Sequence, residues 1–424
     1  MNIAIIGAGY VGLVTGGGLA KLGHRVRLGE ASEERVEFLR GGGVPIYEVG
    51  LPEMLSDAVG SDLMTFHSSN VEAVDGARFV FLCLPTPEGE DGRADLHYIN
   101  SVIEELANVV AADATFVVKS TVPPGTVASL RKKIADLGSH AHVVSHPEFL
   151  REGRAVRDFL EPDRIVVGAW DDAEATAVAD LYESLNPGVV KTDPTSAELI
   201  KYASNAYLAA RLTFVNTLAN VAEAVGADIL DVVDGLGRDH RIGSHFLQPG
   251  PGYGGSCFPK DTLALIAVAA DAGYEFDLLR AVIDADEEQR RRVVDKVRNA
   301  ADGNLENRRI GMWGVAFKAG TDDVRESPAV RIASLLLSEG AEVVAYDPEA
   351  SSELLTMADS AVDAVRGADV LLVATEWEEF KTVDMGAVAE AMTGHRVIDV
   401  RNLLDPKSVR AVGLDYWGFG RPGA

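Results

Sequence analysis

A single cysteine stands in a segment rich in glycine and proline, with charged residues close behind it. The segment runs from Pro249 to Asp261, and four glycines and two prolines precede Cys257 in it. This composition predicts a sharply turning loop rather than a helix or a strand. Lys260 and Asp261 follow three and four residues after the thiol. Because a nearby cation or dipole favours the nucleophilic thiolate, the pattern indicates a reactive cysteine. A buried structural cysteine, the alternative, is more often flanked by apolar residues.

Four further polar residues could act with this thiol. Lys201 and Asn205 are four residues apart in a long helical pattern, so they share one face, and a cation beside an amide suits the stabilisation of an oxyanion. Glu148 follows the apolar run of residues 141–145, and Thr121 lies in a proline-rich turn after another apolar run. Side chains just after parallel strands lie at the ligand-binding edge of a sheet. In isolation, a solvated lysine, a capping asparagine and a helix-capping glutamate would explain three of these residues equally well.

The N-terminus carries a pattern for binding a dinucleotide. An apolar run precedes Gly7-Ala8-Gly9-Tyr10-Val11-Gly12, a helical pattern follows, and Glu30 ends the next apolar run. Glycines permit a tight turn and the close approach of a pyrophosphate, and an acid about 20 residues later can hold ribose hydroxyls. The pattern predicts a Rossmann-like domain that prefers NAD to NADP.

The C-terminal third repeats this plan. Residues 309–314 parallel the first strand and turn, residues 342–347 parallel the second strand, and residues 367–373 parallel residues 76–82. Between the two halves, residues 196–224 and 277–301 are strong helix formers. We therefore predict an α/β fold with two Rossmann-like doubly wound domains joined by a central helical connector. The predicted domains are residues 1–195, which bind NAD, residues 196–302, which form a helical dimerisation domain with the start of the catalytic loop region, and residues 303–424, a second nucleotide-binding domain.

Composition narrows the function classes. A net charge of -26 argues against a nucleic-acid-binding surface, and it fits either a halophilic source or a merely acidic protein. The two cysteines, Cys83 and Cys257, are too few for a disulfide scaffold and suit a reducing cytoplasm. No apolar run reaches the roughly 20 residues of a membrane span, and no signal peptide is expected. The nine histidines show no metal-ligand spacing, so we predict no metal.

Motifs along nearly the whole chain resemble those of the NAD-dependent UDP-glucose/GDP-mannose dehydrogenase family. The segment from Pro147 to Gly153, followed by residues 162–164, is more similar to the UDP-glucose branch than to the branches that act on acetamido sugars. Gln248 stands where some relatives carry a lysine near the diphosphate, and Glu30 stands where an aspartate is usual. The matching segments are residues 7–12, 119–126 and 147–153, Lys201 with Asn205, and residues 250–261, 314–318 and 399–401.

The resemblance implies roles residue by residue, including a UDP-sugar site in residues 303–424 and a homodimer in which Arg241 reaches the neighbouring subunit's site. The implied catalytic residues are Cys257, Lys201, Asn205, Asp261, Glu148 and Thr121. The implied cofactor-binding residues are Gly7, Gly9, Tyr10, Val11, Gly12, Glu30, Arg35, Thr86, Pro87, Thr121, Lys260 and Arg325. The implied substrate-binding residues are Phe149, Leu150, Arg151, Glu152, Lys201, Asn205, Arg241, Phe246, Tyr253, Gly254, Phe317, Lys318 and Arg401.

The implied reaction is the NAD-dependent four-electron oxidation of UDP-glucose to UDP-glucuronate, through a thiohemiacetal and a thioester on Cys257. Covalent capture accounts for the thiol, because a plain alcohol dehydrogenase needs none. The nearest alternative is the same chemistry on GDP-mannose or on a UDP-acetamido sugar. More distant alternatives are a two-electron β-hydroxyacid dehydrogenase and a nucleotide-sugar sensor. The number of NADH molecules formed per substrate separates these classes. A four-electron nucleotide-sugar dehydrogenase forms two, a β-hydroxyacid dehydrogenase forms one and a sensor forms none.

Overall fold

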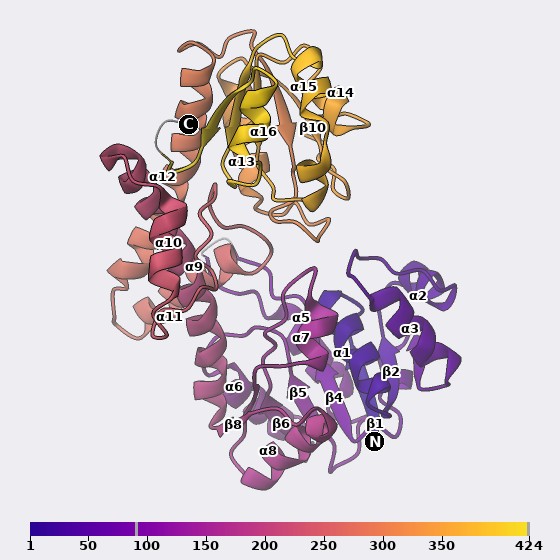
Figure 1. Ribbon diagram of the computed structural model, residues 1–424. Helices are drawn as coiled ribbons and strands as arrows, with labels where there is room; N and C mark the ends of the chain where they lie inside the picture. Colours follow the sequence, from indigo (N-terminus) through magenta and orange to yellow (C-terminus); the bar gives the residue numbers. More distant parts are fainter. Residues whose placement is uncertain (90–91, 422–424) are drawn as a thin grey trace. The chain divides into compact units, whose positions relative to one another are not determined.

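The computed structural model describes residues 1–89 and 92–421, and many of its elements are labelled in Figure 1. The chain divides into two compact units. The N-terminal unit comprises Met1–Ser204 and Leu263–Gly273, and the C-terminal unit comprises Asn205–Thr262 and Tyr274–Ala424. Two helices, α9 (Pro194–Val225) and α11 (Phe258–Asp271), contribute residues to both units. The bounds of the three predicted domains remain a prediction.

The N-terminal unit is built on an eight-stranded sheet in the order β3-β2-β1-β4-β5-β6-β7-β8. Neighbouring strands are parallel except β6 and β7, which pair antiparallel. The order of its first six strands is that of dinucleotide-binding folds. The strands are β1 (Asn2–Ile6), β2 (Arg25–Gly29), β3 (Met64–His67), β4 (Phe79–Leu82), β5 (Thr115–Val118), β6 (His142–Ser145), β7 (Ile165–Gly168) and β8 (Val189–Thr192).

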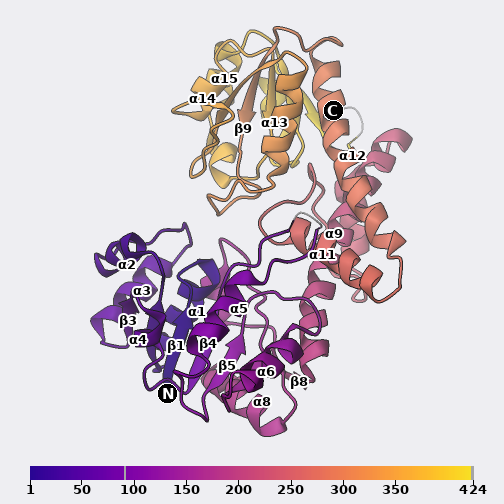
Figure 2. The ribbon, with the colours of Figure 1, turned by 180° about the vertical axis from the view of Figure 1, so that it is seen from behind.

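Helices cover both faces of this sheet because its central strands are apolar on both sides. Ile3 and Ile5 belong to one buried cluster and Ala4 and Ile6 to another, as the alternation of side chains along a strand requires. The first cluster includes residues of α1 (Tyr10–Lys21), α2 (Glu33–Arg40), α3 (Leu51–Gly60), α7 (Ala155–Leu160), α8 (Asp172–Ala179) and the 3₁₀ helix η1 (Asp180–Leu185). The second includes residues of α4 (Asn70–Ala73), α5 (His97–Leu106) and α6 (Thr126–Asp136), of which α5 and α6 can be followed in Figure 2.

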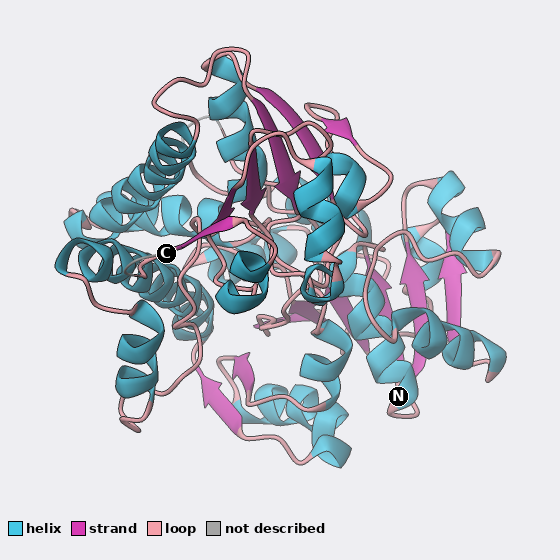
Figure 3. Ribbon diagram, turned by 45° about the horizontal axis from the view of Figure 1, so that its top comes forward, coloured by secondary structure: helices cyan, strands magenta, loops and turns pink. Residues whose placement is uncertain are grey.

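The C-terminal unit contains a six-stranded parallel sheet in the order β11-β10-β9-β12-β13-β14. This order repeats that of β1 to β6, so the predicted repeat of the Rossmann-like plan is confirmed, and Figure 3 shows the sheet flanked by helices. The strands are β9 (Arg309–Trp313), β10 (Glu342–Tyr346), β11 (Thr356–Met357), β12 (Val370–Val373), β13 (Arg396–Asp399) and β14 (Asp415–Gly418). Its other helices are α13 (Pro328–Ser338), α14 (Ala361–Ala364), η2 (Glu378–Thr382), α15 (Met385–Ala391) and α16 (Pro406–Ala411).

Long helices connect the two sheets along the sequence, as predicted. α9 covers the predicted residues 196–224, and α12 (Asp277–Ala300) covers nearly all of residues 277–301. Within the C-terminal unit, Val215 of α9, Ile229 of α10 (Ile229–Gly237) and Val293 of α12 pack in the cluster that covers one face of the six-stranded sheet. The predicted α/β class with a helical connector is confirmed. Within the described residues, no helix is long and apolar enough to cross a membrane.

Candidate active site

The glycine motif forms the turn between β1 and α1. Gly9 is the residue before the helix, and the amide of Leu13 donates to its carbonyl at 2.9 Å. Gly7 has φ +104°, and a Cβ on Gly12 would lie 1.9 Å from the carbonyl oxygen of Gly7. The first helical turn can therefore pack against the loop only without a side chain at position 12. This packing leaves backbone amides at the N-terminus of α1, which suits the pyrophosphate of NAD.

Glu30 stands directly after β2 and contacts this turn. Its carboxylate accepts hydrogen bonds from the amide of Ala8 at 3.0 Å and from the amide of Ser32 at 2.9 Å. Its own amide donates to the carbonyl of His67 at 3.0 Å. Because a carboxylate has about four acceptor positions, two remain for ribose hydroxyls. The geometry therefore fits the ribose role predicted for Glu30.

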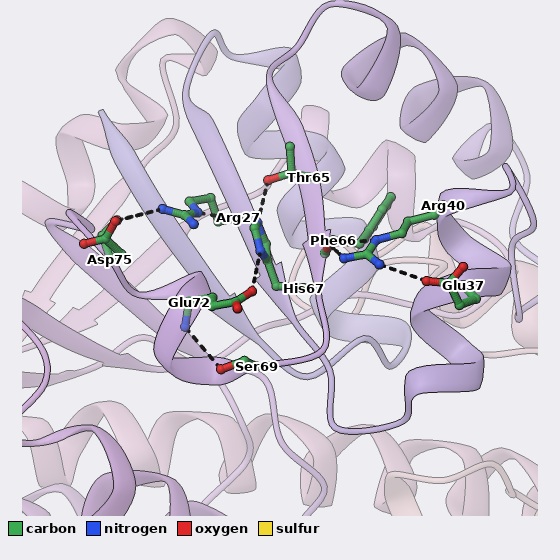
Figure 4. A network of polar contacts seen from close by, with 9 residues as sticks. All are labelled: Arg27, Glu37, Arg40, Thr65, Phe66, His67, Ser69, Glu72 and Asp75. Atoms are coloured by element: carbon green, nitrogen blue, oxygen red, sulfur yellow. Dashed lines mark hydrogen bonds and ion pairs between the residues drawn. The ribbon is translucent and has the colours of Figure 1, made fainter.

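A polar network holds the neighbouring strand ends in place (Figure 4). The His67 ring contacts the hydroxyl of Thr65 at 2.9 Å and the carboxylate of Glu72 at 3.6 Å, and burial lowers the pKa of this histidine. Arg40 donates to the carbonyl of Phe66 at 2.8 Å. Arg35, predicted to bind the cofactor, lies exposed on α2, where its amide donates to the hydroxyl of Ser32.

The ends of β4 and β5 are linked by predicted site residues. The Thr86 hydroxyl donates to the carbonyl of Thr121 at 2.9 Å, and both side chains are buried. The hydroxyl of Ser120 accepts from the amide of Leu84 at 2.9 Å. The structure therefore brings Thr86 and Thr121 together at the carboxyl edge of the sheet, where ligands of such folds bind.

Glu148 and Lys201 form a buried ion pair in the N-terminal unit, with 2.9 Å between Oε1 and Nζ. Burial opposes ionisation of Glu148, but the charge and hydrogen bond of Lys201 outweigh it and hold the pKa of the carboxyl below its usual value. Phe149 lies beside this pair. Its ring centre is 5.5 Å from Lys201 Nζ and 3.5 Å from the Arg164 guanidinium carbon. Two predicted catalytic residues thus meet next to a predicted substrate residue.

Lys119 is a site residue that the sequence analysis left unassigned. It follows β5 directly and is 5% exposed. Burial lowers its pKa to about 8, and its charge interacts with Cys83, Glu148 and Lys201. Cys83 is buried, as expected, and burial raises its pKa to about 12. A lysine directly after an apolar strand was the signal available for Lys119.

Glu48 is a second residue that was missed. Its buried carboxylate accepts from the amides of Gly153 at 2.6 Å and Ala155 at 2.8 Å, and from the hydroxyl of Tyr10. Glu48 therefore ties the glycine turn to the predicted substrate segment. The guanidinium of Arg151, two residues before Gly153, binds Asp158 within the same unit.

In the C-terminal unit, Cys257 immediately precedes α11. The amide of Asp261 donates to the Cys257 carbonyl at 2.9 Å, so Asp261 and Lys260 lie in the first turn of a helix. This corrects the expectation that the loop extends through Asp261, because a proline such as Pro259 is tolerated in the first turn of a helix. Cys257 thus stands at the N-terminal, positive end of α11, where negative charge is stabilised.

Asp261 gathers two other predicted residues around its fully buried carboxylate. Asn205 Nδ2 donates to Oδ2 at 2.6 Å, and Lys260 Nζ binds Oδ1 at 2.5 Å. Lys260 was expected at the cofactor, and in the structure its ammonium binds Asp261. Lys201 and Asn205 are one turn apart on α9, as the sequence predicted.

The glycines before Cys257 lie against the loop that comes after β9. A Cβ on Gly254 would lie 2.4 Å from the carbonyl oxygen of Glu326, and a Cβ on Gly255 would lie 2.9 Å from the Phe317 ring. The amide of Gly255 donates to the carbonyl of Arg325 at 3.1 Å. Arg401 donates to the carbonyl of Phe317 at 3.1 Å. The structure thus brings together four residues predicted to bind ligands.

Aromatic rings surround other predicted residues of this unit, and one predicted residue stands apart. The Phe258 ring lies 6.2 Å from that of Tyr253 and 6.5 Å from that of Phe246. Lys318 Nζ lies 5.5 Å from the Phe317 ring centre. Arg241 is exposed and its guanidinium binds Asp239, so the structure does not place it beside other predicted site residues. Among the described residues, no three His, Cys, Asp or Glu side chains are grouped to hold a metal ion.

Comparison with known proteins places the chain among dehydrogenases. Models of the UDP-glucose/GDP-mannose dehydrogenase family match residues 1–186 (NAD binding domain), 195–288 (central domain) and 311–406 (UDP binding domain). The chain is 40% identical to a UDP-glucose 6-dehydrogenase of Rickettsia conorii, with 99% of each covered. It is also 40% identical to a UDP-glucose 6-dehydrogenase of Pseudomonas aeruginosa, covering 100% of this chain and 98% of that one. A solved UDP-glucose dehydrogenase of Pyrobaculum islandicum is similar with a TM-score of 0.91 and 37% identity, over 99% of this chain and 97% of that one.

Proposed function

The chain belongs to the UDP-glucose/GDP-mannose dehydrogenase family, and from this premise we propose that it oxidises UDP-glucose to UDP-glucuronate with NAD as the hydride acceptor. Similar relatives that cover nearly the whole chain carry the name UDP-glucose 6-dehydrogenase. The observation that carries the proposal is the position of Cys257 at the N-terminus of α11, one turn before the buried Asp261–Asn205 pair. A dehydrogenase that stops at an aldehyde has no use for such a thiol.

The first oxidation converts the primary alcohol of the sugar into an aldehyde. Bound NAD would accept a hydride in this oxidation and again in the next. The alcohol must lose a proton as the hydride leaves, and Asp261 is the proposed acceptor, acting through a water molecule. Asn205 holds the Asp261 carboxylate in place by its hydrogen bond of 2.6 Å.

The second oxidation proceeds on Cys257. The thiolate adds to the aldehyde carbon and gives a thiohemiacetal, whose oxyanion is stabilised by Lys201 and Asn205. Loss of the second hydride leaves a thioester. Glu148 and Thr121 position the water that hydrolyses it, which releases the carboxylate and restores the thiol.

The substrate is tested by NADH formation with a panel of nucleotide sugars. We expect UDP-glucose to give the highest kcat/KM, with GDP-mannose and a UDP-N-acetylhexosamine at least about a hundredfold lower, because a wrong polar group leaves buried partners unpaired. A higher kcat/KM with either competitor would reassign the substrate.

The thiol chemistry is tested with Cys257→Ser, and Cys83→Ser is the matched control because both exchange a cysteine that is in no disulfide. We expect Cys257→Ser to lose turnover and retain NAD affinity, since a hydroxyl is a weak nucleophile at neutral pH. A substrate-derived ester on Ser would be detected by mass spectrometry. Full activity in Cys257→Ser would contradict covalent catalysis.

We also propose a homodimer that uses α9. Apolar side chains at 207, 214, 221 and 225 recur at helical spacing on this helix and are 63%, 57%, 51% and 72% exposed. A row of this kind is expected to be covered by another apolar face. In such a dimer Arg241 would reach the partner's substrate, and its planar guanidinium suits phosphate or sugar oxygens.

Shared sites are tested by mixing Arg241→Ala chains with Cys257→Ala chains. Each variant alone lacks one required group, whereas a mixed dimer would contain one site with both groups intact. We expect activity to return after subunit exchange is verified. No recovery would mean that Arg241 does not serve the partner.

Neither Cys83 nor Cys257 forms a disulfide, and Cys257 must stay reduced to react. We therefore propose that the enzyme works in a reducing compartment such as the cytoplasm. Oxidation with hydrogen peroxide should abolish activity, and dithiothreitol should restore it from the sulfenic acid or disulfide stage.

A further inference from the structure

Two helices of the C-terminal unit hold the backbone of the segment that leads to Cys257. The side chain of Asn216 on α9 accepts from the amide of Gly250 at 2.8 Å, and Gln289 on α12 donates to the carbonyl of Gly250 at 3.0 Å. Asn220 donates to Gln289 Oε1 at 2.9 Å, which fixes the orientation of that amide. Side chains, rather than secondary structure, therefore satisfy both backbone groups of Gly250.

One turn away on α12, a buried ion pair does the same for Tyr253. Asp286 accepts from the Tyr253 amide at 2.9 Å, and Arg290 donates to the Tyr253 carbonyl at 2.9 Å. Asp286 and Arg290 also bind each other, and they are 2% and 7% exposed. Between the two anchored residues, Gly252 has φ +128°, and a Cβ there would lie 3.0 Å from Asp286 Oδ1. The glycine is needed because the carboxylate lies so close to the chain.

Burying the charges of Asp286 and Arg290 costs free energy of desolvation, and a gain in stability does not account for their presence. Taking an arginine and an aspartate out of water is often no more stabilising than placing apolar side chains there. Their bonds to Tyr253, by contrast, fix a segment that has no regular hydrogen-bonding pattern of its own from residue 249 to 254. The same helix packs through Val293, Val294 and Val297 in the core of the six-stranded sheet. α12 therefore holds the cysteine loop in a fixed position relative to that sheet.

We propose that Asp286, Gln289 and Arg290 are positioning residues that clamp the main chain ahead of Cys257 and so fix the thiol for addition to the aldehyde. This clamp rests on the proposed function for its substrate, whereas its effect on the loop can be measured without one. The clamp residues lie outside the turn at Gly7–Gly12, so they should affect kcat and leave the affinity for NAD unchanged.

Asp286→Asn tests the clamp, with Asp284→Asn as the matched control. Both remove one negative charge from α12, but Asp284 is exposed. We expect hydrogen exchange in residues 249–256 to accelerate about tenfold and kcat to fall about tenfold in Asp286→Asn, because a bond to a charged acceptor is weakened. The KM for NAD should stay within about twofold, since a change confined to the loop removes no cofactor contact. The control should match the unsubstituted protein in all three measurements.

Gln289→Glu provides a second variant in case Asp286→Asn does not fold. It keeps the size of the side chain and the acceptor for Asn220, but it turns an acceptor toward the Gly250 carbonyl. Faster loop exchange and a lower kcat are again expected. Loop exchange and kcat equal to those of Asp284→Asn would overturn the clamp. Faster loop exchange in a protein that oxidises no nucleotide sugar would overturn the proposed function instead and support the clamp.

Discussion

The two sheets share one strand order but differ in the segment that connects their first strand to the next helix. In the N-terminal unit only residues 7–9 separate β1 from α1, so the helix N-terminus stands at the glycine turn. In the C-terminal unit residues 314–327 separate β9 from α13, and this longer loop carries Phe317, Lys318 and Arg325. A helix N-terminus offers backbone amides to a pyrophosphate. The longer loop instead presents charged side chains, of which Arg325 binds Asp323 within the loop. The same topology thus presents different polar groups after its first strand in the two units.

The acidic residue after the second strand of each sheet also differs between the two units in its hydrogen-bond partners. Glu30 accepts from two backbone amides, at Ala8 and Ser32. Asp347 accepts from five donors, namely Trp377 Nε1 and the amides of residues 315, 316, 349 and 350. Its acceptor positions are occupied by the protein itself. The acid is therefore suited to a ribose in one sheet and to holding the loop in the other.

The largest effect is expected for Asp347→Ala, which tests whether this acid holds the loop after β9. Removing the carboxylate leaves buried donors without a partner, so we expect the free energy of unfolding to fall by about 3 kcal/mol. Urea denaturation measures it, with the exposed Asp359→Ala as the control. NAD affinity should not change. If the loss matched that of the control, Asp347 would not be structural.

Gly12→Ala tests the glycine turn of the N-terminal unit. Because the new Cβ would lie 1.9 Å from the Gly7 carbonyl oxygen, the turn must open, and we expect NAD to bind about a hundredfold more weakly. Calorimetric titration of NAD and of UDP separates the two ligands, and UDP affinity should persist. Gly60→Ala, where no atom lies within 4 Å of the new Cβ, is the control. Equal loss of both ligands would indicate general unfolding.

A third comparison concerns charges buried after equivalent strands. Asp399 at the end of β13 accepts from the amides of Leu404 and Arg401 and from the Tyr416 hydroxyl, at 2.8 Å, 3.1 Å and 3.1 Å. These bonds oppose the burial of Asp399, which nevertheless raises the pKa of its carboxyl. Lys119 after β5 has its pKa lowered to about 8 by burial. Its charge is therefore less favourable in the folded protein than in the unfolded chain. We expect Lys119→Met to raise the free energy of unfolding at pH 7 by about 2 kcal/mol.

The sign of the pH dependence is set by that lowered pKa. At pH 7 Lys119 is protonated in both states, so the cost is fully present. Above about pH 8 the folded protein releases the proton while the unfolded chain keeps it toward 10.5, and the stability of the unsubstituted protein rises. The advantage of Lys119→Met should therefore shrink between pH 8 and 10, whereas the exposed Lys132→Met should show none. A constant advantage would mean that the charge is not its source.

The smallest effect is expected for Glu30→Gln. The neutral amide removes the repulsion of a ribose 2′-phosphate, so the preference for NAD over NADP should narrow about tenfold in kcat/KM. Glu33→Gln, at the exposed first residue of α2, is the control. An unchanged preference would place the ribose away from Glu30.

Sequence patterns predicted local geometry where the residues involved lie close together in the sequence. The glycine turn, Glu30 and the Cys257 segment could be identified because short spacings determine their geometry. Asp286, Gln289 and Arg290 could not, because residues 284–292 read as a charged, solvated helix face, and their role depends on a loop more than thirty residues earlier. Asp347 likewise matched Glu30 in the repeat, and only its five hydrogen bonds distinguish it. The roles of these residues depend on contacts with residues distant in the sequence, which the spacing of residue types does not reveal.

The central proposal is that one UDP-glucose, captured on Cys257, is oxidised twice before it leaves. The most direct test is to supply limiting UDP-glucose with excess NAD and count the NADH formed at completion. The account predicts two NADH molecules and one UDP-glucuronate per UDP-glucose. One NADH with release of the aldehyde would contradict covalent capture, and no NADH would contradict the dehydrogenase assignment itself.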